Sequence, residues 1–144
     1  MKRIMLIGRS GAGKTSFTQA MKGEQLQYKK TQAIEIVNNV IDTPGEYVEN
    51  RTFYRALVVS AADADCVVLI QSATDPDTSF APGIATMFNR PVIGLVSKID
   101  TAEQAGIKRA QMILEIAGCH RIFHISNLDL TGVDEVCRWL EEND

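Results

Sequence analysis

The most informative segment of the chain is Gly8-Arg9-Ser10-Gly11-Ala12-Gly13-Lys14-Thr15. It matches the pattern G-x-x-x-x-G-K-[ST], and it lies between the apolar run of residues 3–7 and a helix-length segment. Glycines let a backbone wrap around an anion with its N–H groups pointing inward, and the first turn of the following helix adds partial positive charge. The segment therefore predicts a phosphate-binding loop between a strand and a helix.

Side chains at the end of this loop are candidates for contacts with the terminal phosphates of a nucleotide. We expect Lys14, a catalytic candidate, to reach the β- and γ-phosphates as a point charge, and the hydroxyl of Thr15 to bind magnesium. The predicted ligand is a purine nucleotide, GTP or ATP, with Mg2+. The predicted phosphate-binding residues are Gly8, Arg9, Ser10, Gly11, Ala12, Gly13, Lys14, Thr15 and Ser16.

Composition and charge limit the classes of partner. The chain has 144 residues, of which 45% are hydrophobic, so we expect residues 1–144 to form one domain with a real core. The net charge of -3 gives no broad attraction to nucleic acid or to an anionic membrane. No segment approaches the roughly 20 apolar residues that span a bilayer. We therefore expect a cytoplasmic protein that binds neither nucleic acid nor membranes.

Strand-like runs alternate with helix-length segments along the chain, which is typical of a mostly parallel sheet covered by helices on both faces. The predicted strands are residues 3–7, 33–37, 40–42, 66–70, 92–96 and 121–125. Asn38 and Asn39 predict a tight hairpin between the second and third strands, because Asn tolerates positive φ. The expected fold class is therefore α/β, a three-layer α/β/α sandwich of the P-loop NTPase type, mostly parallel with one antiparallel edge strand.

Glycine and threonine residues mark the expected ends of the helices. The first helix is predicted over residues 13–22 with Gly23 as its stop signal. Thr101 is predicted to cap a helix, with Gln104 in the capping-box position, that ends before Gly118. A final helix is expected over residues 131–140, and the irregular stretch 74–88 suggests one short helix.

The cysteine and histidine residues give no sign of a metal site. Cys66, Cys119 and Cys137 form no C-x-x-C pair and lie in apolar stretches, so we interpret them as reduced core residues. His120 and His124 flank the last predicted strand without a third ligand nearby, which favours a structural role.

The segment Asp42-Thr43-Pro44-Gly45-Glu46 follows a short strand. In this position Asp42 is predicted to hold magnesium through water, and the N–H of Gly45 is predicted to reach the γ-phosphate. Thr31, in the preceding loop, is a further predicted magnesium ligand. Glu46 is the second catalytic candidate. Efficient GTPases place there a glutamine that orients the attacking water, and a carboxylate adds negative charge, so we expect slow hydrolysis.

The segment Ser97-Lys98-Ile99-Asp100 ends a predicted strand and resembles the guanine-specificity motif of GTPases, N-K-x-D or T-K-x-D. Asp100 is predicted to accept hydrogen bonds from guanine N1–H and the exocyclic amine, which adenine does not supply, while the stem of Lys98 packs on the base. Ser97 departs from the usual Asn or Thr. Ser126 and Asn127, at the end of the last strand, complete the predicted nucleotide-binding set.

Taken in order, these elements resemble the layout of small Ras-like GTPases over essentially the whole chain. More closely, the chain resembles the EutP/PduV family of bacterial ethanolamine- and propanediol-utilisation operons. The segments that carry this resemblance are residues 1–8, Lys30-Thr31-Gln32-Ala33, Ile41-Asp42-Thr43-Pro44-Gly45-Glu46-Tyr47, Glu49-Asn50-Arg51 and residues 91–98. The resemblance implies a protein associated with a bacterial microcompartment, and acetate kinase activity has been attributed to members of the family.

Three functions stay open at this point. The first is a slow GTPase switch, supported by Asp100. The second is transfer of the ATP γ-phosphate to acetate, which needs a cationic binder such as Arg9, Arg51 or Lys30. The third is a non-catalytic scaffold that docks on shell proteins of the microcompartment. Its candidate surface consists of Tyr47, Phe53 and Tyr54, although these residues are expected to pack against the sheet.

Overall fold

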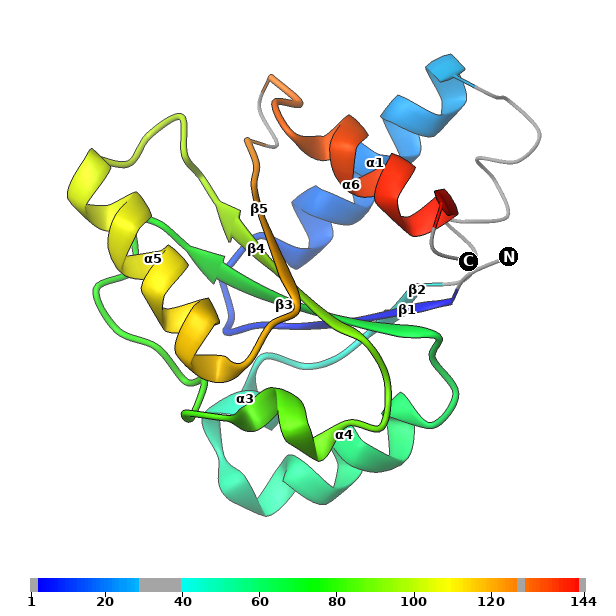
Figure 1. Cartoon of the computed structure of the whole chain (residues 1–144), viewed down its shortest axis with the longest axis vertical. Helices are drawn as coiled ribbons and strands as arrows, with labels where there is room; N and C mark the ends of the chain where they lie inside the picture. Colours follow the sequence, from blue (N-terminus) through cyan, green and yellow to red (C-terminus); the bar gives the residue numbers. More distant parts are fainter. Residues whose placement is uncertain (1–2, 29–39, 127–128, 143–144) are drawn as a thin grey trace.

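The structure is a computed structural model that describes residues 3–28, 40–126 and 129–142. Its centre is a five-stranded sheet in the order β2-β1-β3-β4-β5 (Figure 1). Each neighbouring pair of strands is parallel, so the carboxyl ends of all the strands lie at one edge of the sheet. The strands are β1 (Ile4–Ile7), β2 (Val40–Asp42), β3 (Cys66–Ser72), β4 (Val92–Ser97) and β5 (Arg121–His124).

The central strands of the sheet are buried along their whole length, as continuous apolar runs predict for strands covered on both faces. The strands predicted at residues 66–70 and 92–96 are confirmed, and they extend to Ser72 and Ser97. β1 begins at Ile4 rather than Arg3, and β5 ends at His124 rather than Ile125. These differences leave the predicted candidate residues at the carboxyl edge of the sheet.

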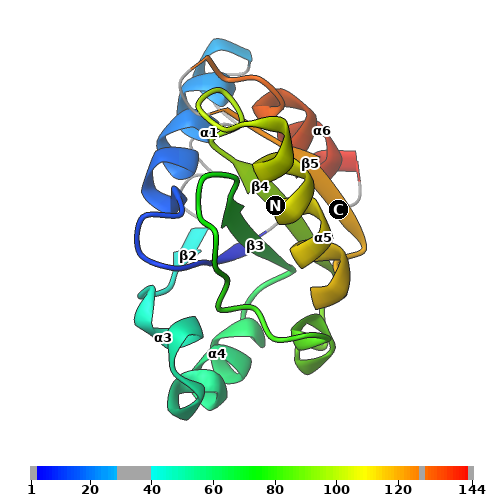
Figure 2. The same ribbon diagram turned by 90° about the vertical axis from the view of Figure 1, so that its left-hand side faces the viewer.

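Helices cover both faces of the sheet (Figures 1 and 2). On one face, α1 and α6 contact each other and bury side chains such as Phe17 and Val136 in a common cluster. On the other face, α4 and α5 contribute Leu57 and Leu114 to a second cluster. The arrangement confirms the predicted α/β sandwich. The helices are α1 (Lys14–Tyr28), α3 (Glu46–Glu49), α4 (Tyr54–Ala61), α5 (Gln104–Ala117), α6 (Val133–Glu142), and the 3-10 helices η1 (Arg51–Phe53) and η2 (Ile84–Met87).

The predicted end of the first helix is wrong, because α1 continues through Gly23 to Tyr28. A glycine inside a helix costs only about 1 kcal/mol relative to alanine. The residues after it, Glu24-Gln25-Leu26-Gln27, all have high helix propensity, so the helix has little reason to stop at this glycine.

The predicted cap of α5 is also wrong. The helix begins at Gln104 with Glu103 in the capping position, and the Thr101 hydroxyl donates instead to the Lys98 carbonyl at 3.3 Å. The turn after β4 thus uses Thr101 before the helix begins. Gly118 ends the helix with a φ of 99°, as predicted. The final helix is shifted to Val133–Glu142, and η2 is the short helix expected within residues 74–88.

The predicted hairpin falls mainly on residues 33–39, which lie outside the described residues. Its second strand is observed as β2, which pairs in parallel with β1. The antiparallel edge strand therefore stays a prediction. Among the helices of the described residues, none combines the length and the apolar character that a membrane span requires.

Candidate nucleotide-binding site

The loop of residues 8–15 joins the buried end of β1 to the first turn of α1, at the carboxyl edge of the sheet. Within it, the Ala12 N–H donates to the Arg9 carbonyl at 3.0 Å, which closes a tight turn. Gly13 has a φ of 108°, in the left-handed region that glycine adopts without steric cost. The chain therefore takes the loop-then-helix form in which backbone N–H groups bind anions.

Lys14 folds back over this loop. Its Nζ donates hydrogen bonds to the carbonyls of Gly8 at 2.7 Å and Arg9 at 3.3 Å. Burial lowers the pKa of Lys14, and the nearby carboxylates of Asp42 and Glu49 oppose that shift. The ammonium group is thus held against the loop. A phosphate bound there would supply a negative charge that offsets the cost of partly burying the ammonium.

The end of β4 is fastened to the same loop by two side chains. The hydroxyl of Ser97, which is fully buried, donates to the Ala12 carbonyl at 2.7 Å. The ammonium of Lys98 donates to the Gly11 carbonyl at 2.7 Å, and Lys98 has a positive φ of 61°. The structure thus joins the segment predicted to read the base to the segment predicted to hold the phosphates.

The end of β2 lies on the other side of the loop. The hydroxyl of Thr43, which is buried, donates to the Leu6 carbonyl of β1 at 2.7 Å and so fixes the start of the segment 43–46. A cavity of about 510 Å³ opens between these parts, lined by loop residues together with Asp42, Gly45 and Lys98. Most of the predicted phosphate-binding residues line it.

Oxygen atoms suited to magnesium line this cavity. The hydroxyl-bearing Thr15 and the carboxylate-bearing Asp42 both contribute to its wall, and both residues are exposed. Magnesium prefers oxygen ligands and keeps several waters beside substrate phosphates, so a set of two protein oxygens fits that ion. The third predicted ligand, Thr31, lies outside the described residues.

The predicted cationic residues and the catalytic candidate Glu46 occupy different positions. The Arg9 guanidinium pairs with the Asp75 carboxylate at 3.3 Å, so its charge is already matched. Arg51 is exposed at the first position of η1. Glu46 is exposed at the first position of α3, directly after Gly45. Lys30 lies outside the described residues.

The remaining predicted residues lie at the ends of β4 and β5. Asp100 is exposed two positions after Lys98, beyond the carboxyl end of β4. The Ile99 N–H donates to the Ile125 carbonyl at 3.4 Å, which brings the two strand ends together. Ser126 is buried, and its hydroxyl accepts from the Asp129 N–H at 3.5 Å. Asn127 lies outside the described residues.

Two acidic residues without a sequence-predicted role contact the loop. Glu49, on α3, accepts from the Ser10 N–H at 3.5 Å. Asp75 pairs with Arg9 across a separation of 66 residues. No local pattern signals either contact, because each depends on how distant segments meet after folding.

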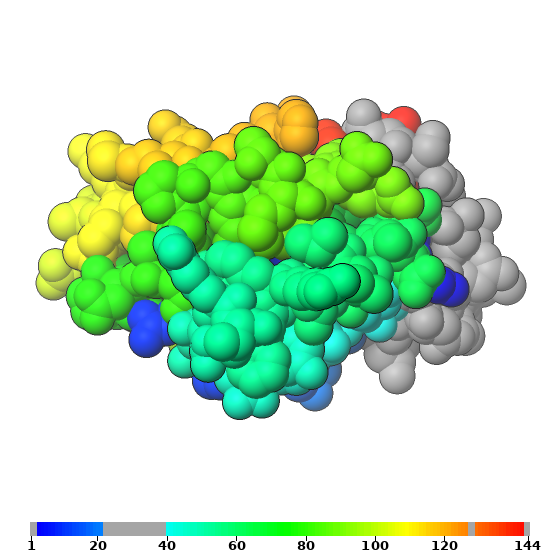
Figure 3. All heavy atoms as spheres, turned by 90° about the horizontal axis from the view of Figure 1, so that it is seen from below, coloured from blue at the N-terminus to red at the C-terminus, as the bar shows by residue number. Residues whose placement is uncertain are grey.

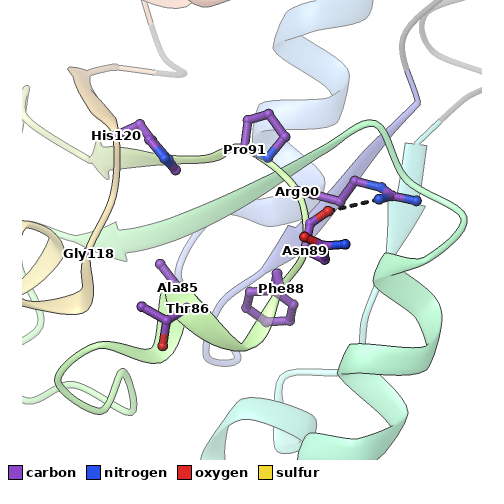
Figure 4. Close-up of a pocket in the computed structure, with 8 residues that line it drawn as sticks. All are labelled: Ala85, Thr86, Phe88, Asn89, Arg90, Pro91, Gly118 and His120. Atoms are coloured by element: carbon purple, nitrogen blue, oxygen red, sulfur yellow. Dashed lines mark hydrogen bonds between the residues drawn. The ribbon is translucent and has the colours of Figure 1, made fainter.

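A larger cavity of about 600 Å³ lies near the starts of β4 and β5, at the opposite edge of the sheet (Figure 4). Its polar groups are largely engaged with backbone. The Arg90 guanidinium donates to the carbonyls of Ala64 at 2.6 Å, Ala62 at 2.9 Å and Asn89 at 2.8 Å. His120 accepts from the Val92 N–H at 3.2 Å through Nδ1. These bonds hold strand ends and loops, so we interpret the cavity as structural.

The histidines and cysteines take structural places in the described residues. His124 bonds through Nε2 to the Gln111 side chain at 2.7 Å. Cys66 and Cys137 are buried, and burial raises the pKa of the Cys119 thiol to about 12. Within the described ranges no group of three or more His, Cys, Asp or Glu residues is placed to hold a metal ion.

Solved structures of GTPases share this fold. The elongation factor SelB of Methanococcus maripaludis, in complex with the GTP analogue GppNHp, matches with a TM-score of 0.68 and 21% identity over 98% of this chain. This chain spans only 33% of that one. The FeoB G-domain of Methanococcus jannaschii matches with a TM-score of 0.63 and 21% identity, over 97% of this chain and 95% of that domain. These likenesses establish the P-loop GTPase fold.

Curated relatives and one family model match nearly the whole chain. The propanediol utilization protein PduV of Citrobacter freundii is 52% identical over 136 residues, covering 94% of this chain and 91% of PduV. The Escherichia coli K12 protein named "Probable acetate kinase EutP" is 30% identical over 142 residues, covering 97% of this chain and 89% of that protein. The family model described as "Ethanolamine utilisation - propanediol utilisation" matches residues 1–142. The chain belongs to the PduV-EutP family.

Proposed function

We propose that this chain is a slow GTPase switch, which binds a purine nucleoside triphosphate with magnesium in ethanolamine or propanediol utilisation. The observation that carries the proposal is the double connection between loop and strand. Ser97 and Lys98 each donate a 2.7 Å hydrogen bond to a carbonyl of the loop. A base bound beyond β4 and phosphates bound in the loop would therefore lie at a fixed separation.

Asp100 supports guanine over adenine as the base. Its carboxylate is exposed beyond the end of β4, where it is free to accept hydrogen bonds from a ligand. Guanine offers two donors on one edge, N1–H and the exocyclic amine, which match the two oxygens of a carboxylate. Adenine presents an acceptor at N1, so a carboxylate there disfavours ATP.

Thr15 and Asp42 would hold the magnesium ion beside the phosphates. Such an ion neutralises charge on the β- and γ-phosphate oxygens. Lys14 adds a fixed positive charge on the loop side, and the Gly45 N–H adds a donor from the segment after β2. Glu46 follows at the position where efficient GTPases have the glutamine that orients the attacking water. Its carboxylate adds negative charge beside the γ-phosphate, so we expect hydrolysis to be slow.

The name of the EutP relative points to an alternative, transfer of the ATP γ-phosphate to acetate. That reaction needs a cation to bind the acetate carboxylate near the γ-phosphate. Arg9 is paired with Asp75, and Arg51 is exposed in η1, so the described residues give this reaction no specific support. The alternative therefore rests on the name of a relative.

A second alternative is a scaffold that binds nucleotide only for stability and docks on microcompartment shell proteins. The residues of its candidate surface contact other parts of this chain. The Tyr47 and Phe53 rings stack at 4.8 Å, and Tyr47 and Tyr54 pack against the core. The association with shell proteins stays a prediction.

The experiment measures binding and turnover of GTP and ATP with magnesium, with and without acetate, for the wild type and Asp100→Asn. We expect GTP binding with slow turnover that acetate does not accelerate. In Asp100→Asn we expect weaker GTP binding and stronger xanthosine triphosphate binding, because the amide then matches the O2 carbonyl of xanthine. A bidentate base contact of this kind is worth about 1–3 kcal/mol, or roughly fivefold to more than a hundredfold in Kd.

Other results would select another function. ATP turnover that requires acetate and is unchanged in Asp100→Asn would replace the switch with the kinase. Tight nucleotide binding without turnover would favour the scaffold. Absence of binding to either nucleotide would refute all three.

A further inference from the structure

The segment after β2 lies directly against the phosphate-binding loop. A Cβ atom added at Gly45 would lie 2.5 Å from the Ser10 nitrogen and 2.6 Å from its Oγ. Real side-chain atoms do not approach that closely, so the contact exists only because residue 45 is a glycine. The segment after β2 therefore packs closely on the side of the loop where Gly45 is predicted to meet a γ-phosphate.

Glu49 extends this contact one helical turn further on. Its carboxylate accepts from the Ser10 N–H at 3.5 Å, a long hydrogen bond at an exposed position. The same carboxylate acts on Lys14, whose pKa it raises against the effect of burial. Glu49 thus places a negative charge close to Ser10 and Lys14, two of the predicted phosphate-binding residues.

The segment that carries Glu49 is internally braced. Asn50 accepts at its Oδ1 from the Thr52 N–H at 3.0 Å and from the Thr52 hydroxyl at 2.9 Å. The Tyr47 and Phe53 rings stack with an angle of 7° between their planes. Figure 3 shows α3, η1 and α4, in cyan to green, as one continuous part of the surface. A displacement of Glu49 would therefore also move the neighbouring residues of this segment.

We propose that Glu49 sets the preference of this site between diphosphate and triphosphate nucleotides, by placing its carboxylate where a γ-phosphate must approach Ser10 and Lys14. The inference rests on the proposed nucleotide-binding function. A diphosphate fills the inner part of the loop and leaves the Glu49 contact in place. A triphosphate brings a second negative group to the same donors, so Glu49 must withdraw and the triphosphate is bound less tightly.

The test compares the Kd values of GDP and GTP with magnesium, and of ADP and ATP in parallel, in the wild type, Glu49→Gln and Glu49→Ala. Two unit charges at about 4 Å in water interact by about 1 kcal/mol, which corresponds to roughly a fivefold change in Kd. We expect each variant to bind the triphosphate about fivefold more tightly, while the diphosphate Kd changes by less than about twofold. Glu141→Gln, on the exposed side of α6, removes the same charge and should leave both Kd values unchanged.

Hydrogen exchange gives a second readout. In the wild type, adding the triphosphate should increase amide exchange across residues 49–53 more than adding the diphosphate does. In Glu49→Ala, these amides should exchange faster before any nucleotide is added.

Equal changes in the diphosphate and triphosphate Kd values would overturn this inference while leaving the nucleotide-binding function intact. Weaker triphosphate binding in Glu49→Gln would also overturn it, because Glu49 would then support the γ-phosphate or its metal. Absence of binding by the wild type would refute the proposed function, and this inference with it.

Discussion

The hydrogen bond from Ser97 to the phosphate-binding loop can be removed with one small substitution, Ser97→Ala. The Ser97 side chain is 0% exposed, and its hydroxyl donates to the Ala12 carbonyl at 2.7 Å. In the variant a methyl group faces that carbonyl, and Ala12 itself is 5% exposed, so water reaches the carbonyl poorly. A buried polar group that loses its partner costs about 1–3 kcal/mol.

The measurement is unfolding in urea and by heat, followed by nucleotide titration. For a domain of this size, 1 kcal/mol changes Tm by about 3 °C. We therefore expect Ser97→Ala to lower Tm by about 3–9 °C. Because the loop then loses one of its two connections to β4, we also expect nucleotide affinity to fall by roughly tenfold, or about 1.4 kcal/mol.

Two control variants separate the hydrogen bond from other effects. Ser97→Thr keeps the hydroxyl, so it should bind nucleotide more tightly than Ser97→Ala does, while its added methyl lowers stability at this buried position. Ser79→Ala removes a half-buried hydroxyl outside the cavity and should change stability by less than about 0.5 kcal/mol. If Ser97→Ala matched the wild type in both Tm and nucleotide affinity, the hydrogen bond would contribute nothing and the reasoning would be refuted.

Three further predictions concern Lys14, Gly106 and Cys119. Burial lowers the pKa of Lys14 below 10.5. Lys14 loses its positive charge as pH rises through this lowered pKa, so triphosphate affinity should fall over the same range. Lys14→Arg, whose side chain stays charged, should remove this pH dependence. In Gly106→Ala the new methyl would collide with the Ala73 carbonyl oxygen. The free energy of unfolding measured in urea should therefore fall by about 1–3 kcal/mol, whereas helix propensity alone would raise it by about 1 kcal/mol. Because burial raises the Cys119 thiol pKa to about 12, mass spectrometry should find Cys119 unmodified by iodoacetamide at pH 8 until the protein is denatured.

The sequence was sufficient to predict the layers of the fold and the place of the loop. The loop pattern at residues 8–15 combines fixed glycine spacing with a preceding strand and a following helix, so local rules specify it. The runs at residues 66–70 and 92–96 are apolar throughout, which predicts strands buried on both faces. Those two kinds of signal are local, and the structure bears out both.

The connections between segments were not predictable in the same way. Ser97 was expected to lie near the base, and its hydrogen bond to Ala12 depends on the packing of β4 beside the loop. Arg9 and Asp75, which form an ion pair, are separated by 66 positions in the sequence. Glu49 and Ser10, which form a hydrogen bond, are separated by 39 positions. Side-chain partners at such separations are fixed by tertiary packing, which single-residue propensities do not encode.

The two sides of the loop are held with different strength, so we expect the more weakly held side to respond to a nucleotide. Ser97 and Lys98 hold it with 2.7 Å hydrogen bonds, one of them fully buried. On the other side Glu49 holds it with a 3.5 Å hydrogen bond at an exposed position. A long, exposed bond is readily exchanged for one to water, whereas breaking a buried bond leaves a polar group unpaired. We therefore expect a γ-phosphate that enters the cavity to displace the Glu49 carboxylate and to leave the connection to β4 intact.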